Sequence, residues 1–214
     1  MSPEVRLAAA FDRIDAANAE VPNFELDGER EVPKELLYGQ RMSAALRAFA
    51  PEASPAVQLA ARAQHIRRWT VPRSDFPMDR AGYHRWRTHL YGVHADEAEA
   101  ILREVGYDDA TVAQVRKMLR KKGIKSDPEV QLLEDVICLC FLRHYWADFA
   151  AKHDEAKLIG ILQKTWRKMS PAGQAAALKL PLRSEDLALV EKALAGVRGD
   201  RERGSEQRGG QGSA

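Results

Sequence analysis

Three polar side chains within apolar helical stretches are the first candidates for chemistry. His65 lies in "LAARAQHIRRW", His94 follows Leu90 by about one helical turn, and Asp135 lies within "LLEDVICLCFL". A buried carboxylate is costly unless it is paired or bound to a cation. Two imidazoles and a carboxylate inside a helical protein suit a divalent metal ion such as Mn, Co, Fe, Zn or Mg. We therefore predict a metal site at His65, His94 and Asp135, where the ion would activate water and neutralise a phosphate.

Each of these residues also has a simpler explanation. A single His on a helix is more often a hydrogen-bonded core residue than a metal ligand. Asp135 is about as well explained by an ion pair with an Arg as by metal binding. The prediction therefore depends on whether the fold brings the three side chains together.

Basic and aromatic residues form the second group of candidates. Seven arginines fall between Arg62 and Arg87, interleaved with Trp69, Tyr83 and Trp86. Arginine binds phosphate or carboxylate oxygens in fork geometry, and an aromatic ring stacks on a base or packs on a sugar. The simpler explanation is that Arg and Lys coat helix surfaces while Trp fills the core. The predicted substrate-binding residues are Arg62, Arg73, Arg80, Trp86, Arg87, Lys164 and Lys168.

The elements that position these residues are helices, because apolar residues recur at helical spacing along most of the chain. Ser54 and Pro55 suit a helix start, Gly106 suits a helix end, and Asp109 and then Ser126 or Asp127 suit the next two starts. Residues 21–33 and 70–79 are predicted to be loops. Helices are predicted over residues 3–19, 34–49, 53–69, 110–123, 126–152, 154–169, 170–180 and 184–197, with one or two helices within residues 80–106.

The predicted class is all-α, with a single HD-like helical domain over residues 1–198. A chain of 214 residues is long enough for one domain with a full core, and strand-like alternation never extends beyond a few residues. The segment 199–214 consists of Gly, Arg, Glu, Gln, Ser, Asp and Ala, and it has little apolar surface to bury. We expect this tail to be disordered.

Composition narrows the class of protein. The net charge of +2 argues against a general nucleic-acid binder, although local clusters of charge still matter. Cys138 and Cys140 sit two residues apart on a predicted helix and so point in different directions, which favours reduced, buried thiols. We expect no membrane span and no secretion signal, and a cytoplasmic location is the default.

The order of the three candidate ligands resembles the HD-domain superfamily of metal-dependent phosphohydrolases. "QHIRRW" is similar to the first His motif, His94 stands where a His-Asp doublet is expected, and Asp135 matches the final Asp. This resemblance covers about residues 55–150 and implies an all-helical fold with a metal centre. The chain departs from the doublet because Ala95 follows His94. Glu97 or Glu134 is then the predicted catalytic residue, as a replacement ligand or proton acceptor.

A second resemblance covers nearly the whole chain. The segments "LAARAQHIRRW", "GYHRWR", "HADEAEAIL", "LEDVICLCFL" and "KLIGILQKTWRKMSPAG" are similar to the signature blocks of the domain-of-unknown-function 4202 family. This resemblance implies little about activity. The chemistry must therefore be argued from the residues themselves.

The expected function is metal-dependent hydrolysis of a nucleotide or another phosphorylated ligand. The first alternative is an RNA- or tRNA-directed enzyme or binding protein that uses the same pocket and a wider basic surface, with steep salt dependence. The second is a non-catalytic helical scaffold that has lost its metal. The wider basic surface would comprise Arg67, Arg68, Lys117, Arg120, Lys121, Lys122 and Lys168.

Overall fold

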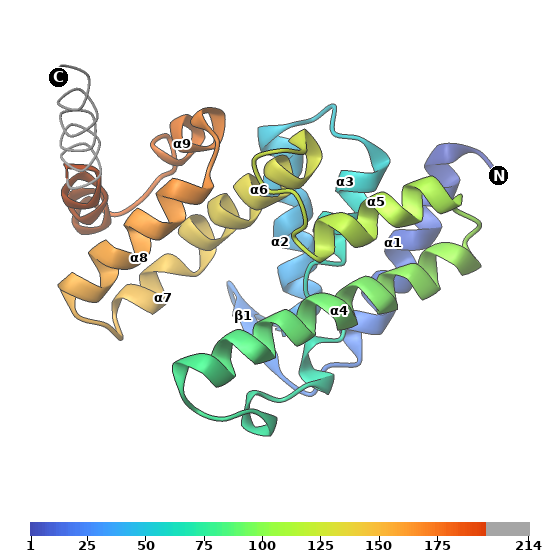
Figure 1. Cartoon of the computed structure of the whole chain (residues 1–214), viewed down its shortest axis with the longest axis horizontal. Coiled ribbons are helices and arrows are strands. Elements are labelled where there is room, and N and C mark those ends of the chain that lie inside the picture. The colour runs from blue at the N-terminus through green and yellow to red at the C-terminus, as the bar shows by residue number, and fades with distance from the viewer. Residues whose placement is uncertain (196–214) are drawn as a thin grey trace, which may run out of the picture. The chain divides into compact units, whose positions relative to one another are not determined.

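Helices make up most of residues 1–195, the part of the chain that the computed structural model describes (Figure 1). The predicted all-α class is confirmed. By its internal contacts the chain divides into two compact units, Met1–Ile137 and Cys138–Ala214. A single domain over residues 1–198 stays a prediction, and the predicted tail 199–214 lies outside the described residues. No helix within residues 1–195 is long and apolar enough to cross a membrane.

The first unit contains the elements that carry most of the candidate residues. Buried apolar side chains from α1 to α6 form its core, and α4 packs on α5 while α3 packs on both α2 and α5. The elements in chain order are α1 (Pro3–Ala19), β1 (Phe24–Asp27), β2 (Arg30–Pro33), α2 (Lys34–Phe49), α3 (Pro55–Arg62), the 3-10 turns η1 (Arg68–Thr70) and η2 (Arg73–Asp75), α4 (Arg80–Glu104), α5 (Asp109–Leu119) and α6 (Pro128–His144), whose residues from Cys138 onward belong to the second unit.

Helix starts follow the predicted capping chemistry with one correction. The Ser54 hydroxyl accepts from the Val57 amide at 3.3 Å, and Pro55 occupies the first turn of α3. Asp127 is the cap of α6, because its Oδ1 accepts from the Glu129 and Val130 amides. The cap of α5 is Asp108, which accepts from the Thr111 amide at 2.8 Å; the prediction of Asp109 is wrong by one residue.

Residues 21–33, predicted to be a loop, contain a two-stranded hairpin. Asp27 pairs with Arg30 across a two-residue turn, and Gly28 takes the positive φ of 65° that such a turn requires. Arg41 of α2 anchors the hairpin by ion pairs to Glu25 and Asp27. The strands are only four residues long, so alternation was too brief to indicate them.

The helix predicted over residues 53–69 ends earlier, at Arg62. Hydrogen bonds to distant elements hold the backbone after Arg62 in a non-helical conformation. The Ile66 carbonyl accepts from His94, and the Asn18 side chain accepts from the Arg67 amide. Arg67 itself adopts the left-handed conformation, with φ 48°. His65 therefore lies in a turn and is not on the helix that carries Arg62.

In the second unit the side chain of Trp146 is almost fully buried and contacts the rings of Phe141 and Phe149. Its indole Nε1 donates to Asp186 Oδ1 at 2.7 Å, and Arg183 Nε donates to Asp186 Oδ2 at 2.7 Å. The predicted thiols Cys138 and Cys140 are free and buried. Besides the end of α6, this unit contains α7 (Trp146–Ala150), α8 (Glu155–Lys168), α9 (Pro171–Ala177) and helical residues from 184 to 195.

Asp186→Ala is expected to lower the free energy of unfolding by about 2 kcal/mol, because it leaves the buried Trp146 Nε1–H without its acceptor. Asp186→Asn keeps an acceptor for the indole and should lose less. Glu185→Ala is the matched control, since that side chain is exposed and its ion pair with Arg183 contributes little. Urea unfolding followed by Trp fluorescence measures all three; equal losses in Asp186→Ala and Glu185→Ala would contradict the assignment.

Candidate functional site

A cavity in the first unit brings together side chains from α2, α4, α6 and the turns that follow α3 and α5. Its volume is about 70 Å³. Since about 10–15 Å³ of such space holds one water molecule, the cavity takes a group of a few heavy atoms and is too small for a nucleoside. The lining residues are Tyr38, Gln64, His65, Arg68, Arg87, Leu90, Tyr91, His94, Lys121 and Ile137.

His94 is buried on α4, and its Nδ1 lies 2.8 Å from the carbonyl oxygen of Ile66. Because a carbonyl only accepts, Nδ1 carries the proton and donates it. Burial lowers the pKa of His94 to about 4, so the ring is neutral at pH 7. Its Nε2 therefore keeps a lone pair.

His65 stacks on the ring of Tyr38, with centroids 3.8 Å apart and planes 12° apart. Its Nε2 lies 3.1 Å from Arg68 Nη1 and accepts from it, since a guanidinium only donates. Burial, with the charge of Arg68 as a second cause, lowers the pKa of His65 well below its usual value. The rings of His65 and His94 are 5.9 Å apart, so two neutral imidazoles lie side by side.

Two arginines on the cavity wall form no ion pair with a carboxylate in the described part of the chain, although the charge of Glu35 also acts on Arg68. The guanidinium of Arg68 lies over the ring of Trp86, 4.6 Å from its centroid, and burial lowers its pKa. Arg87 Nη2 donates to the Tyr91 hydroxyl at 2.8 Å. Within residues 1–195, neither guanidinium lies within 4.0 Å of a carboxylate oxygen. The wall is therefore electropositive.

Lys121 adds a third cation to the cavity wall, and its backbone is in the left-handed conformation. With φ 55°, it follows the C-cap of α5 at a position where helices usually have Gly. Its Nζ lies 2.5 Å from Glu134 Oε2 and 5.7 Å from the centre of the Tyr91 ring. A non-Gly residue in this conformation costs on the order of 1 kcal/mol. Such strain is typical of functional sites.

The donor groups of the cavity suit an anion better than a divalent cation. Asp135 is buried on α6 and accepts from Gln131 Nε2 at 3.1 Å, and it is not among the lining residues. The two imidazoles thus meet in a wall with two arginines that form no ion pair, and their charge disfavours a metal ion there. Within residues 1–195, no three His, Cys, Asp or Glu side chains form a group that suits a metal ion. The metal site at His65, His94 and Asp135 stays a prediction.

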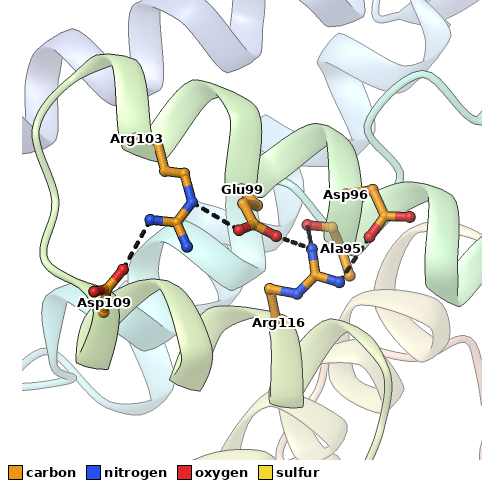
Figure 2. A network of polar contacts seen from close by, with 6 residues as sticks. All are labelled: Ala95, Asp96, Glu99, Arg103, Asp109 and Arg116. Carbon is orange, nitrogen blue, oxygen red and sulfur yellow. Dashed lines mark hydrogen bonds and ion pairs between the residues drawn. The ribbon is translucent and has the colours of Figure 1, made fainter.

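The acidic run after His94 faces basic partners (Figure 2). Arg116 of α5 pairs with Asp96 at 2.8 Å and with Glu99, and it also donates to the Ala95 carbonyl. Glu99 in turn accepts from Arg103. The contacts of Arg116 link α4 to α5 (Figure 2). Asp96 and Glu99 therefore stabilise the packing of these two helices.

The two predicted catalytic carboxylates also contact cations. Glu97 is half-buried and lies 3.6 Å from Arg67 Nε, while Glu134 is buried against Lys121. Neither lines the cavity. Glu134 nevertheless acts on it indirectly, because its ion pair orients the Lys121 side chain.

A family described as a domain of unknown function, DUF4202, matches residues 8–190. The chain belongs to this family. No curated protein and no solved structure matches the chain. The resemblance to the HD-domain superfamily stays a prediction.

The remaining predicted substrate-binding residues of this DUF4202 chain have other partners or lie elsewhere. Arg62 forms a two-pronged pair with Asp15, and its Nη1 donates to Ser43 at 3.3 Å. Trp86 is buried and donates to the Val71 carbonyl. Arg62 and Trp86 do not line the cavity, whereas Arg87 does.

Arg73 holds the loop before α4 by donating to the carbonyls of Phe76, Pro77 and Asp79. Arg80 is exposed at the start of α4. Lys164 and Lys168 are exposed on α8, in the second unit. Their predicted contacts with substrate stay predictions.

Sequence reasoning did not place Tyr38, Gln64 and Tyr91 at the site, and it assigned Arg68 and Lys121 only to a wider basic surface. The sequence contains no signal for Lys121, because Gly123 is the expected end of that helix. For Tyr38 and Gln64 there is no signal either, because their positions depend on how α2 packs on the turn after α3.

Proposed function

We propose that the first unit binds the phosphate group of a phosphorylated small molecule or nucleotide in this cavity. The observation that carries the proposal is the pair Arg68 and Arg87, two guanidinium groups on one cavity wall without a carboxylate partner within residues 1–195. Lys121, which is paired with Glu134, adds a further N–H donor from another element. The cavity volume fits a phosphate group and leaves the rest of the ligand outside.

The electrostatics support this ligand class. Removing a cation from water without a counter-charge is costly, and burial already lowers the pKa of Arg68. A bound phosphate would supply the missing negative charge and accept charge-assisted hydrogen bonds from both guanidinium groups. The two imidazoles stay neutral and so add no further repulsion among the cations.

Hydrolysis of the bound ester is the reaction that we propose from the sequence pattern. The neutral imidazole of His94 supports it, because the lone pair on its Nε2 can accept the proton of an attacking water molecule, whereas that of His65 is used by Arg68. Release of inorganic phosphate from a panel of nucleotides and sugar phosphates tests this step. The metal content of the protein, purified without a His-tag, tests the predicted cofactor independently.

Arg87→Met is expected to weaken binding of inorganic phosphate and of AMP by at least about tenfold, because it removes an unneutralised donor from the cavity. Arg85→Met is the matched control: it removes the same charge from an exposed position on the same helix, two residues away. Isothermal titration calorimetry at constant ionic strength measures both. Equal affinities in the two variants would overturn the proposal.

The same titrations separate a small-molecule site from an RNA surface. Binding of a single phosphate group in the cavity should depend weakly on salt, whereas RNA binding through many phosphates falls steeply as salt rises. Lys122→Met, at an exposed position beside Lys121, should then affect RNA binding more than phosphate binding. The RNA-directed alternative stays a prediction.

A further inference from the structure

The cavity contains hydrogen-bond acceptors as well as donors. Arg68, Arg87 and Lys121 only donate. His94 differs, because its Nδ1–H is used by the Ile66 carbonyl and its Nε2 is left as an acceptor. Gln64 is buried in the same wall, and its side-chain amide carries a donor as well as an acceptor, so it does not distinguish one protonation state of an oxyanion from another. His94 Nε2 is thus an acceptor in a site otherwise built for an anion.

A fully deprotonated oxyanion would leave the Nε2 acceptor of His94 unsatisfied. Sulfate has only acceptor oxygens, so beside His94 Nε2 it places lone pairs against a lone pair. Hydrogenphosphate carries an O–H that donates to Nε2, while its other oxygens accept from Arg68 and Arg87. A buried polar group without a partner costs about 1–3 kcal/mol, so this difference decides between ligands of similar size and charge.

We propose that this site selects a phosphate group that carries its own O–H donor, namely hydrogenphosphate or the singly protonated form of a phosphate monoester, and that His94 Nε2 accepts this hydrogen bond. The inference rests on the proposed phosphate-binding function and deepens it by naming the protonation state of the ligand. It also gives His94 two distinct roles. Nδ1 donates to the Ile66 carbonyl and so holds the turn that carries His65 and Arg68, and Nε2 accepts the hydrogen bond from the ligand.

The experiment compares three dianions at pH 8: inorganic phosphate, monofluorophosphate and sulfate. Of the three, only phosphate has an O–H; in monofluorophosphate a fluorine of similar size replaces it. Calorimetric titration of the full chain at constant ionic strength should show phosphate binding at least about tenfold tighter than either of the others. Equal affinities for phosphate and monofluorophosphate would overturn the selectivity while leaving oxyanion binding intact. Binding of none of the three would overturn the phosphate-binding function itself.

One variant tests the acceptor. His94→Asn keeps a donor near the position of Nδ1 for the Ile66 carbonyl and removes Nε2. The ratio of phosphate to monofluorophosphate affinity should fall toward one, and circular dichroism checks the fold. If the folded variant keeps the full ratio, the assignment is wrong. The comparison of ligands on the unaltered chain remains decisive if the variant fails to fold.

Discussion

Acidification from pH 7 to pH 4 is expected to lower the free energy of unfolding by about 3 kcal/mol through His94 alone. Burial lowers the pKa of His94 from 6.5 to about 4 in the folded chain. Between these two pH values His94 is protonated in the unfolded chain but stays neutral in the folded chain. The stabilisation is therefore complete above the unfolded value and is lost as the pH falls toward 4. The lowered pKa of His65 acts in the same direction.

His94→Asn isolates this contribution, because Asn retains a donor for the Ile66 carbonyl and does not titrate. Its free energy of unfolding should change much less between pH 6.5 and pH 4.5 than that of the unaltered chain. Urea unfolding at several pH values gives both curves, and their difference removes the shared effect of carboxylates. His84→Asn, at an exposed position on the same helix, serves as the control and should keep the full pH dependence. Parallel curves for His94→Asn and the unaltered chain would refute the assignment.

Gly82→Ala is expected to destabilise the chain by about 3 kcal/mol or more. A Cβ built at Gly82 meets the Pro77 carbonyl oxygen at 2.0 Å and the Pro77 carbonyl carbon at 2.7 Å. Both atoms belong to the backbone of the loop that Arg73 holds, so they cannot rotate away as a side chain would. The first turn of α4 must move, and with it the cap that Asp79 provides to Gly82.

Gly92→Ala, in the same helix, is the matched control with the opposite sign. There the nearest neighbour of the added Cβ is Arg120 Nη2 at 3.6 Å, which is ordinary contact. Since Ala is a better helix former than Gly, this variant should gain about 0.5–1 kcal/mol. Thermal unfolding ranks the two variants. If the two variants were equally stable, the loop that contains Pro77 would be able to move without loss of stability, and the prediction would be wrong.

The site could be predicted from the sequence only in part. His65 and His94 do meet, because each follows an apolar run that must face the core. Among the predicted substrate-binding residues, only Arg87 lines the cavity that contains them. Arg62 could not be separated from Arg68 by type or spacing, because the difference lies in Asp15, a partner 47 positions away that neutralises one and not the other.

By itself, the sequence determined the all-α class, the starts of α3 and α6, the end of α4 near Gly106 and the buried thiols Cys138 and Cys140. These features follow from apolar periodicity, capping side chains and the freedom of glycine at positive φ, all of which act over a few residues.

Only the tertiary structure decided where α3 ends and which cations stay unneutralised. The backbone of "AQHIRRW" favours a continued helix by local propensity. It turns instead, because His94 and Asn18 offer hydrogen bonds that arrive from distant elements. The same packing sets Arg116 against the acidic run after His94 and leaves Arg68 and Arg87 facing the cavity. Charged residues form a binding site only when the fold leaves them without an oppositely charged partner. Which side chains pair depends on their distances in space, and the spacing of residues along the chain does not determine these distances.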